Sequence, residues 1–256
     1  MNGAPVRKPA FVKLGGSLIS DKSGENVLRR PALRRLTSEI AKAEMPVVLF
    51  HGAGSYGHPQ AMRAKIGSKP VATPAVTATL ASVAMLQAEV VDAAQAAGLY
   101  PVAVSLQRTV AEGDNLTDLP VESITRLLEE GCTPVLSGTV VRDRTLGWRI
   151  SSADALMAEC SHDISPRIGV FATDVDGVYN GEPGKGELLP VVRPTTIPAM
   201  VESRRPDATG SMRGKLLRAF ALAEACPVLI LNGNVRGRLL DALKGKQVPS
   251  TRIETA

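Results

Sequence analysis

The sequence predicts an α/β protein with a mostly parallel central sheet. Short apolar runs of strand length alternate with longer segments in which apolar residues recur every three or four positions, the pattern of successive βαβ units. With 256 residues, the chain is long enough to bury such a sheet in one compact unit. Apolar residues make up 44% of the chain and aromatic residues only 3%, so we expect an aliphatic core.

The predicted strands and helices alternate in order along the chain. Strands are expected at 10–14, 46–50, 101–105, 133–136, 168–173 and 227–231. Helices are expected at 31–43, 76–98, 120–130, 152–160 and 212–225. Pro31 is typical of the first turn of a helix, and Gly98 and Gly131 are typical of the position just after a helix end. These three residues therefore support the predicted boundaries.

Three stretches depart from this alternation. Residues 106–119 and 138–150 combine Thr, Gly, Asp and Arg with short β-like pieces, which predicts a hairpin or flap over the sheet. Residues 179–211 are rich in Gly, Pro, Thr and Arg. So long a segment without regular structure in a compact domain is usually functional.

The charge distribution limits the class of partner. The formal net charge is +5, but the basic residues are scattered and few aromatic residues accompany them. Such a chain offers no stacking platform for nucleic acid. A modest positive balance suits an enzyme that attracts small phosphorylated substrates, so we expect a small-molecule substrate and no nucleic-acid partner.

The cysteines and the N-terminal residues limit the compartment. Cys132, Cys160 and Cys226 are odd in number and far apart, which predicts reduced thiols without a disulfide framework or a zinc site. The first residues contain no apolar stretch of the signal-peptide type, and we expect no run long enough to cross a bilayer. The sequence therefore predicts a cytoplasmic protein without a membrane partner.

Two glycine-rich turns follow the first two predicted strands. They are Lys13-Leu14-Gly15-Gly16-Ser17 and His51-Gly52-Ala53-Gly54-Ser55-Tyr56-Gly57-His58. Glycine lets main-chain N–H groups approach an anion closely, and a helix N-terminus adds partial positive charge. Lys13 and Lys22 supply full charges where phosphoryl oxygens gather. Neither turn has P-loop or dinucleotide-binding spacing, so a kinase of another lineage is indicated.

Two further motifs follow later strands. Thr173-Asp174-Val175-Asp176-Gly177-Val178-Tyr179 lies where a buried strand leaves the sheet, which is where ligands of open α/β sheets bind. A tight turn with Asx hydrogen bonds would explain the same residues without a ligand. Lys215 follows a polar turn in the first turn of a helix, where the helix dipole favours an anion. A solvated lysine is the plainer alternative.

Ser152 and Asp154 begin a predicted helix after a β-like piece. A carboxylate there could accept hydrogen bonds from main-chain amides as part of an N-terminal cap. It could equally hold lysines in position by charge-assisted hydrogen bonds. The residues alone favour neither explanation.

In this order, the motifs resemble the amino acid kinase superfamily and, within it, the isopentenyl phosphate kinases. The resemblance rests on residues 13–17, 51–58, 152–154, 173–179, 207–215 and Asn232-Gly233. It implies an open αβα sandwich that forms a single domain over residues 1–256. The N-terminal half, about 1–165, would bind the phosphoryl acceptor and form a homodimer. The C-terminal half, about 166–256, would bind ATP.

The resemblance also implies a reaction and a set of site residues. The reaction is transfer of the γ-phosphoryl group of ATP to isopentenyl phosphate, with Mg²⁺ carried by the ATP phosphates and no metal bound by side chains. The implied catalytic residues are Lys13, Lys22, His58, Asp154 and Lys215. The implied acceptor-binding residues are Gly16, Ser17, Gly52, Ala53, Gly54, Gly57, His58, Gly138 and Ser152. The implied ATP-binding residues are Lys13, Gly15, Gly16, Thr173, Asp174, Asp176, Gly177, Tyr179, Gly210, Gly214 and Lys215.

Each implied catalytic residue has a role. Lys13 would stabilise the transferring phosphoryl group, Lys215 would hold the ATP phosphates from the other side, and Asp154 would organise the two lysines. His58 would bind the acceptor phosphate, although a histidine that bonds only to its own turn is the alternative. The apolar face of helix 76–98, which includes Val83, could line a prenyl tail or simply face the core.

The chain departs from the isopentenyl phosphate kinase pattern in three places. Ala53 stands where glycine is usual, Ser137-Gly138-Thr139 replaces a Gly-Asp pair, and Ser152-Ala153-Asp154-Ala155 replaces Ser-Gly-Asp-Asp. These changes concern the acceptor more than the phosphoryl transfer. The alternatives are a fosfomycin kinase or another small phosphate or phosphonate kinase of the same fold, and a non-catalytic protein that binds nucleotide or stores oxyanions.

Overall fold

The structure, a computed structural model, describes residues 7–21, 23–113, 115–181, 186–196 and 212–255. Among these residues, eight strands form one sheet in the order β14-β16-β15-β11-β1-β4-β8-β5. Its strands are β1 (Ala10–Leu14), β4 (Val47–His51), β5 (Pro101–Ala103), β8 (Thr133–Ser137), β11 (Ile168–Thr173), β14 (Val191–Val192), β15 (Val228–Asn232) and β16 (Ser250–Ile253). Neighbouring strands are parallel except for β15 and β16, so the predicted mostly parallel sheet is confirmed.

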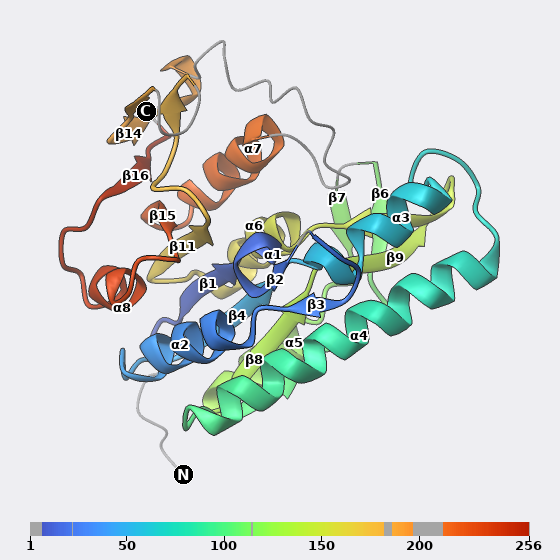
Figure 1. Cartoon of the computed structure of the whole chain (residues 1–256), viewed down its shortest axis with the longest axis horizontal. Helices are drawn as coiled ribbons and strands as arrows, with labels where there is room; N and C mark the ends of the chain where they lie inside the picture. The colour runs from blue at the N-terminus through green and yellow to red at the C-terminus, as the bar shows by residue number, and fades with distance from the viewer. Residues whose placement is uncertain (1–6, 22, 114, 182–185, 197–211, 256) are drawn as a thin grey trace.

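Helices cover both faces of this sheet (Figure 1). On one face lie α2 (Arg30–Ala41), α4 (Thr73–Ala96) and α8 (Arg238–Leu243), whose buried residues form one apolar cluster with the sheet. On the other face lie α5 (Val121–Glu129), α6 (Ala153–Ile164) and α7 (Met212–Ala223), which form a second cluster. The architecture is therefore the predicted open αβα sandwich.

The alternation of side chains along β1 assigns each residue to one face. Ala10, Val12 and Leu14 belong to the cluster under α2, α4 and α8. Phe11 belongs to the cluster under α5, α6 and α7. Because side chains alternate with a period of two, Lys13 points to the same face as Phe11. The only lysine of β1 is thus directed toward α6 and α7.

A second, four-stranded sheet stands beside the first and confirms the predicted hairpins. Its order is β10-β9-β6-β7. Its strands are β6 (Val110–Glu112), β7 (Asn115–Thr117), β9 (Thr139–Asp143) and β10 (Gly147–Ser151). Both β6–β7 and β9–β10 are antiparallel pairs. Because β10 leads directly into α6, this sheet sits next to the residues that begin that helix.

Several short elements have no counterpart in the sequence-based prediction. They are α1 (Gly16–Ile19), β2 (Ser20–Asp21), β3 (Val27–Leu28), η1 (Gly54–Tyr56), α3 (His58–Ala64), β12 (Tyr179–Asn180), β13 (Glu187–Leu188), η2 (Pro194–Thr196), α8, β14 and β16. Most are too short to show a period of 3.6 or 2 residues. The predicted loop 179–211 is thus partly regular up to residue 196, and its remainder lies outside the described residues.

Helix α4 corrects the expectation that no segment is long enough to cross a bilayer. It has 24 residues, and an 18-residue window within it has a mean hydropathy of 1.4. By length and composition it passes the test for a membrane span, as do core helices of soluble proteins. The helix also begins earlier than predicted, because Pro74 stands in its first turn, where proline is favoured.

Candidate functional site

The order of the strands locates a crevice at the carboxyl ends of β1 and β11. After β1 the chain continues to β4 on one side, whereas β11 pairs with β1 on the other side. Ligands of open α/β sheets bind at such a change of direction. The Gly15 N–H donates to the Ala172 carbonyl at 2.9 Å, which joins the turn after β1 to the end of β11. Two of the predicted motifs therefore meet at this point.

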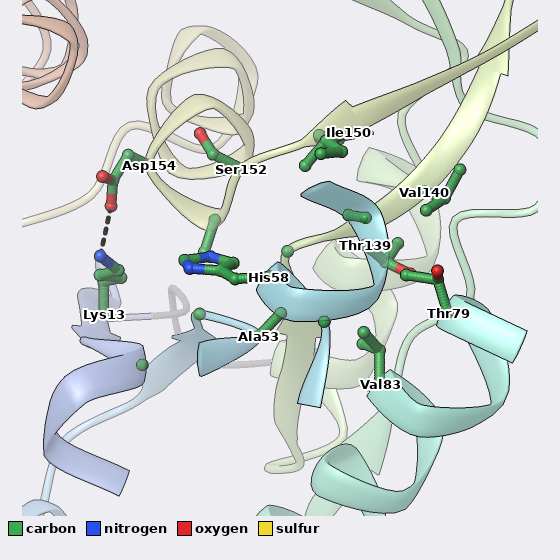
Figure 2. Close-up of a pocket in the computed structure, with 17 residues that line it drawn as sticks. Lys13, Ala53, His58, Thr79, Val83, Thr139, Val140, Ile150, Ser152 and Asp154 are labelled. Atoms are coloured by element: carbon green, nitrogen blue, oxygen red, sulfur yellow. Dashed lines mark ion pairs between the residues drawn. The ribbon is translucent and has the colours of Figure 1, made fainter. Parts of the chain in front are cut away.

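Lys13 and Asp154 form a largely buried ion pair in the crevice. The Lys13 Nζ lies 2.7 Å from the Asp154 Oδ1, and the two side chains are only 9% and 15% exposed (Figure 2). Burial alone would raise the pKa of Asp154, but the charges of Lys13 and then of Lys215 more than offset it, so the pKa lies below its usual value. Three predicted residues from β1, α6 and α7 thus converge.

The start of α6 explains how Asp154 reaches this position. The Ser152 Oγ accepts a hydrogen bond from the Ala155 N–H at 3.1 Å, so Ser152 is the N-cap of the helix. Asp154 then lies in the first turn and is directed at Lys13. Of the two explanations left open for the carboxylate, the structure favours the second, because Ser152 is the N-cap of the helix and Asp154 pairs with Lys13.

The two glycine-rich turns pack backbone against backbone. A methyl group on Gly16 would lie 2.6 Å from the Gly54 Cα, and one on Gly52 would lie 2.9 Å from the Gly16 nitrogen. Gly54 has a φ of +51°, a value that L residues rarely adopt. A side chain at any of these three positions would therefore push the two turns apart.

Two of the glycine amides predicted to bind phosphate are already engaged within the protein. The Gly15 N–H donates to Ala172, and the Gly52 N–H donates to the Leu14 carbonyl at 3.0 Å. Gly16 is instead the first residue of α1, where a main-chain N–H has no partner inside the helix. The structure therefore favours Gly16 over Gly15 and Gly52 as a donor to an anion.

A cavity of about 60 Å³ adjoins the Lys13–Asp154 pair. Most of the predicted acceptor residues line it, namely Gly16, Gly52, Ala53, Gly57, His58, Gly138 and Ser152. Figure 2 shows the His58 ring extending from α3 toward the ion pair. Ser17 and Gly54 were predicted here as well, but they are not among the lining residues. Ser17 lies on α1, and Gly54 faces Gly16 and Ser20.

The far wall of this cavity was missed by the motif analysis. It consists of aliphatic and small side chains from α3, α4, β9 and β10, namely Ala61, Thr79, Val83, Val140 and Ile150. Of these, only Val83 belonged to the predicted apolar face of helix 76–98. Such residues carry no motif, and only the fold brings them together. An apolar periodicity in β9 and β10 was the available signal.

A second cavity of about 410 Å³ lies on the other side of Asp154. Its lining includes Arg149, Lys215 and Arg218 together with Gly214 and Asp154. Asp154 thus stands in the wall of both cavities. Positive side chains surround the carboxylate on the side of α7, which suits an anionic ligand.

The motif at residues 173–179 is ordered by its own hydrogen bonds and by contacts with β16. The Thr173 Oγ1 donates to the Asp174 Oδ1 at 3.1 Å, and the Tyr179 OH donates to the Asp176 Oδ2 at 3.3 Å. A methyl group on Gly177 would lie 2.3 Å from the Thr251 Oγ1. The glycine at 177 is therefore required by packing on β16, without reference to a ligand.

Some predicted residues cannot be placed. Lys22 and Gly210 lie outside the described residues. Within the part of the chain that the structure describes, no group of three or more His, Cys, Asp or Glu side chains converges as a metal site. Two carboxylates of the crevice are held by cations, Asp154 by Lys13 and Asp176 by Arg238.

The chain is similar in sequence to proteins of one known family. The amino acid kinase family model matches residues 8–232. An isopentenyl phosphate kinase from Methanothermobacter thermautotrophicus is 34% identical over 95% of this chain and 98% of its own. One from Thermoplasma acidophilum is 27% identical over 90% of this chain and 94% of its own.

Solved structures agree with these relatives. A crystal structure described as isopentenyl phosphate kinase superposes with a TM-score of 0.83 at 32% identity, and the match covers 95% of this chain and 99% of that one. The matched segment of the family model runs from before Lys13 to Asn232 and so contains both glycine-rich turns, Asp154 and Lys215. The chain therefore belongs to the amino acid kinase family.

Proposed function

We propose that this protein is an ATP-dependent kinase that phosphorylates isopentenyl phosphate to give isopentenyl diphosphate and ADP. The relatives that carry the name isopentenyl phosphate kinase support this function, since they match the chain over nearly its whole length. The observation that carries it is the small cavity, which combines His58 and the Lys13–Asp154 pair at one end with an aliphatic wall at the other.

The proposed reaction needs little covalent chemistry from the protein. An oxygen of the acceptor phosphate bonds to the γ-phosphorus of ATP while the bond from that phosphorus to the β,γ-bridging oxygen breaks, and ADP leaves. The acceptor is already an anion, so no general base is required. Catalysis then comes from in-line positioning and from cations around the transferred group. Lys13 and Lys215, which both lower the pKa of Asp154, are the two cations proposed to contact the transferred group and the ATP phosphates.

His58 is the proposed ligand of the acceptor phosphate. It starts α3 and lines the same cavity as Lys13 and Asp154. An imidazole N–H can bind a non-bridging oxygen without neutralising the attacking one. With His58 on the acceptor phosphate, the lysine side chains can contact the transferred phosphoryl group and the leaving ADP.

The size and character of the cavity support a short prenyl tail. A volume of about 60 Å³ holds roughly four to six water-sized groups at ~10–15 Å³ each. The wall made by Val83, Val140 and Ile150 offers no charged partner for a polar acceptor such as an amino acid or a nucleoside. Binding a five-carbon chain there removes apolar surface from water, whereas a polar group would lose its hydration.

The nucleotide half is proposed to bind ATP across the crevice. The turns after β11 and β15 border it, and the Gly16 N–H and Lys215 are the proposed contacts to the phosphates. ATP carries Mg²⁺ into the site, where the ion neutralises part of the phosphate charge. Division into an acceptor half, about 1–165, and an ATP half, about 166–256, is part of this proposal, as is a cytoplasmic location.

A homodimer through α4 is also part of the proposal. Only a third of the apolar window of α4 is buried, and its outer face presents Ala81, Ala84 and Ala88 around Met85, which is 57% exposed. The edge strand β5 and the 73% exposed Tyr100 continue this apolar surface. Its occupant is proposed to be a second copy of the chain. Sedimentation equilibrium should give twice the chain mass of 26.9 kDa, and a monomer at micromolar concentration would contradict the dimer.

The function is tested by coupled detection of ADP release with ATP and Mg²⁺. Isopentenyl phosphate, dimethylallyl phosphate, fosfomycin, UMP and acetylglutamate are offered in parallel, with Lys13→Ala protein as the inactive control. The proposal expects selective turnover of the prenyl monophosphates. Preferential turnover of fosfomycin would mean that fosfomycin, and not isopentenyl phosphate, is the acceptor. ATP binding without turnover of any acceptor would favour a non-catalytic protein.

A further inference from the structure

The carboxylate of Asp176 joins three segments at the nucleotide side of the crevice. The Arg238 Nη1 forms an ion pair with its Oδ1, and the Tyr179 OH donates to its Oδ2 at 3.3 Å. The Asn232 side chain also hydrogen-bonds to it. These partners come from the start of β12, the end of β15 and the start of α8. Arg238 lies outside all of the sequence motifs, so the sequence analysis did not include it in the site.

The main chain that presents Arg238 is held from the acceptor half. Glu39 on α2 is a buried carboxylate that accepts the Gly237 N–H at 3.0 Å and the Leu240 N–H at 3.4 Å. It therefore caps the start of α8, whose first residue is Arg238. A guanidinium on so firmly anchored a backbone is pre-organised for its partner.

The preceding turn is fixed by the same helix. Arg35 of α2 donates from its Nη2 to the Gly233 carbonyl at 2.5 Å and from its Nη1 to Glu39 at 2.7 Å. The Gly233 N–H in turn donates to the Thr173 carbonyl at 2.8 Å. The segment from residue 232 to 238 is thus tied at both ends, once to the nucleotide motif and once to α2.

The ion pair matters electrostatically because of where it stands. Asp176 follows β11 in the turn that borders the crevice, and it is 37% exposed, whereas Arg238 is only 12% exposed. The hydrogen bond from Arg238 is the foremost cause that holds the pKa of Asp176 below its usual value, so the carboxylate is ionised at neutral pH. Without the guanidinium, a negative charge near a bound triphosphate would repel it, and the turn 173–179 would lose an anchor.

We propose that Arg238 is a positioning residue of the nucleotide site, which holds Asp176 and cancels its charge so that the turn 173–179 accepts ATP. The inference rests on the proposed function in taking ATP as the ligand of this crevice. It adds a residue outside the motifs, and it predicts an effect on the nucleotide alone.

The test is steady-state kinetics of Arg238→Gln, with both substrates varied, together with calorimetric binding of ADP without acceptor. The KM for ATP should rise about tenfold, equivalent to ~1.4 kcal/mol, and ADP binding should weaken by a similar factor. The KM for isopentenyl phosphate and kcat should stay within about twofold, because the acceptor cavity does not contain Arg238. Arg252→Gln is the matched control: it removes an ion pair between the exposed Arg252 of β16 and Glu254, and it should change neither KM.

A second variant distinguishes the electrostatic effect of Arg238 on Asp176 from a purely structural effect of the substitution. In Arg238→Gln/Asp176→Asn the unpaired carboxylate is absent, so much of the ATP affinity should return, whereas a purely structural loss would add to the first. Arg238→Lys keeps the charge and should give an intermediate KM for ATP, and it serves in place of Arg238→Gln if that protein does not fold.

The inference and the proposed function fail differently. If the wild-type protein turns over isopentenyl phosphate but Arg238→Gln leaves the KM for ATP unchanged, or raises both KM values equally, the inference is overturned and the function stands. If the wild type phosphorylates no prenyl phosphate while Arg238→Gln still weakens ADP binding and the double variant restores it, the function is wrong and the inference stands.

Discussion

The proposed acceptor side and the proposed nucleotide side of the crevice are built by different means. On the acceptor side, glycine backbones interlock within van der Waals distance and enclose a cavity of about 60 Å³ with buried, mostly apolar walls. On the nucleotide side, turns are held by side-chain hydrogen bonds and by an ion pair whose carboxylate is partly exposed. Under the proposed function, the first arrangement would select a ligand by volume, and the second would hold a polyanion by charge. Substitutions should therefore act through sterics on one side and through electrostatics on the other.

The largest effect is expected where the two sides meet. Lys215→Ala should lower kcat about 10²–10³-fold with the fold intact, because it removes a cation that stabilises charge developing in the transition state. The measurement is the ADP-release rate at saturating substrates, alongside the circular dichroism spectrum. Lys246→Ala, which removes an exposed lysine paired with Asp241, is the control. Turnover at the wild-type rate would remove Lys215 from the site.

The next effect concerns the pH dependence of stability. Burial lowers the pKa of His51 to about 4, and a hydrogen bond with the Gly52 carbonyl offsets it only in part. Between pH 6.5 and 4 the unfolded chain binds a proton at this site and the folded chain does not. The free energy of unfolding should therefore fall as the pH is lowered through this window, by up to about 3 kcal/mol at ~1.36 kcal/mol per pKa unit.

Urea denaturation between pH 7 and pH 4 checks this prediction. His51→Asn should flatten the pH profile in this window, because the buried ring that binds a proton only in the unfolded chain is then absent. A wild-type stability that stays constant from pH 6.5 to 4 would show that the His51 ring is not kept neutral by burial.

His58→Ala should affect the proposed acceptor side alone. The KM for the acceptor should rise at least about tenfold, since a hydrogen bond to a charged group contributes roughly 1.5–3 kcal/mol. The KM for ATP should change less than twofold. Steady-state kinetics with each substrate varied in turn measures both constants. Equal increases in the two would indicate that His58 serves the fold of its turn and not the acceptor.

The smallest effects contrast one glycine from each side. Gly16→Ala should lower the free energy of unfolding by roughly 1–3 kcal/mol, because the new methyl group meets the Gly54 backbone. Gly214→Ala, in α7, has open space for its methyl group and should raise stability by roughly 0.5–1 kcal/mol, as alanine does in a helix. Chemical denaturation of both variants compares them. A Gly16→Ala protein as stable as the wild type would contradict the close contact between the two turns.

Much of the sheet was predictable, and the reason lies in its strands. The buried strands β1, β4, β8, β11 and β15 are apolar runs that need no partner to be recognised, and the long helices show their period plainly. By contrast, α1, α3 and α8 are too short to show a period, and β16 depends on pairing with β15. Their positions follow from tertiary contacts that local sequence does not encode.

The candidate site also contains residues that the sequence predicts and residues that it does not. Lys13, Asp154 and Lys215 stand in motifs whose residue types already indicate phosphate chemistry, and the fold brings them together. The aliphatic wall and Arg238 carry no motif: Val140 and Ile150 look like ordinary strand residues, and Arg238 like one more surface cation. Their places depend on the pairing of β9 with β10 and on the Glu39 cap of α8. The engaged amides of Gly15 and Gly52 were equally invisible, because hydrogen-bond partners appear only in three dimensions.

If one cavity binds the acceptor phosphate beside Lys13 and Asp154, the new bond forms on that phosphate. The most direct measurement is ³¹P NMR of wild-type protein with ATP, Mg²⁺ and isopentenyl phosphate. We expect the monophosphate resonance to disappear while two coupled diphosphate resonances grow in step with ADP. Release of inorganic phosphate from ATP, with the isopentenyl phosphate resonance unchanged, would contradict it.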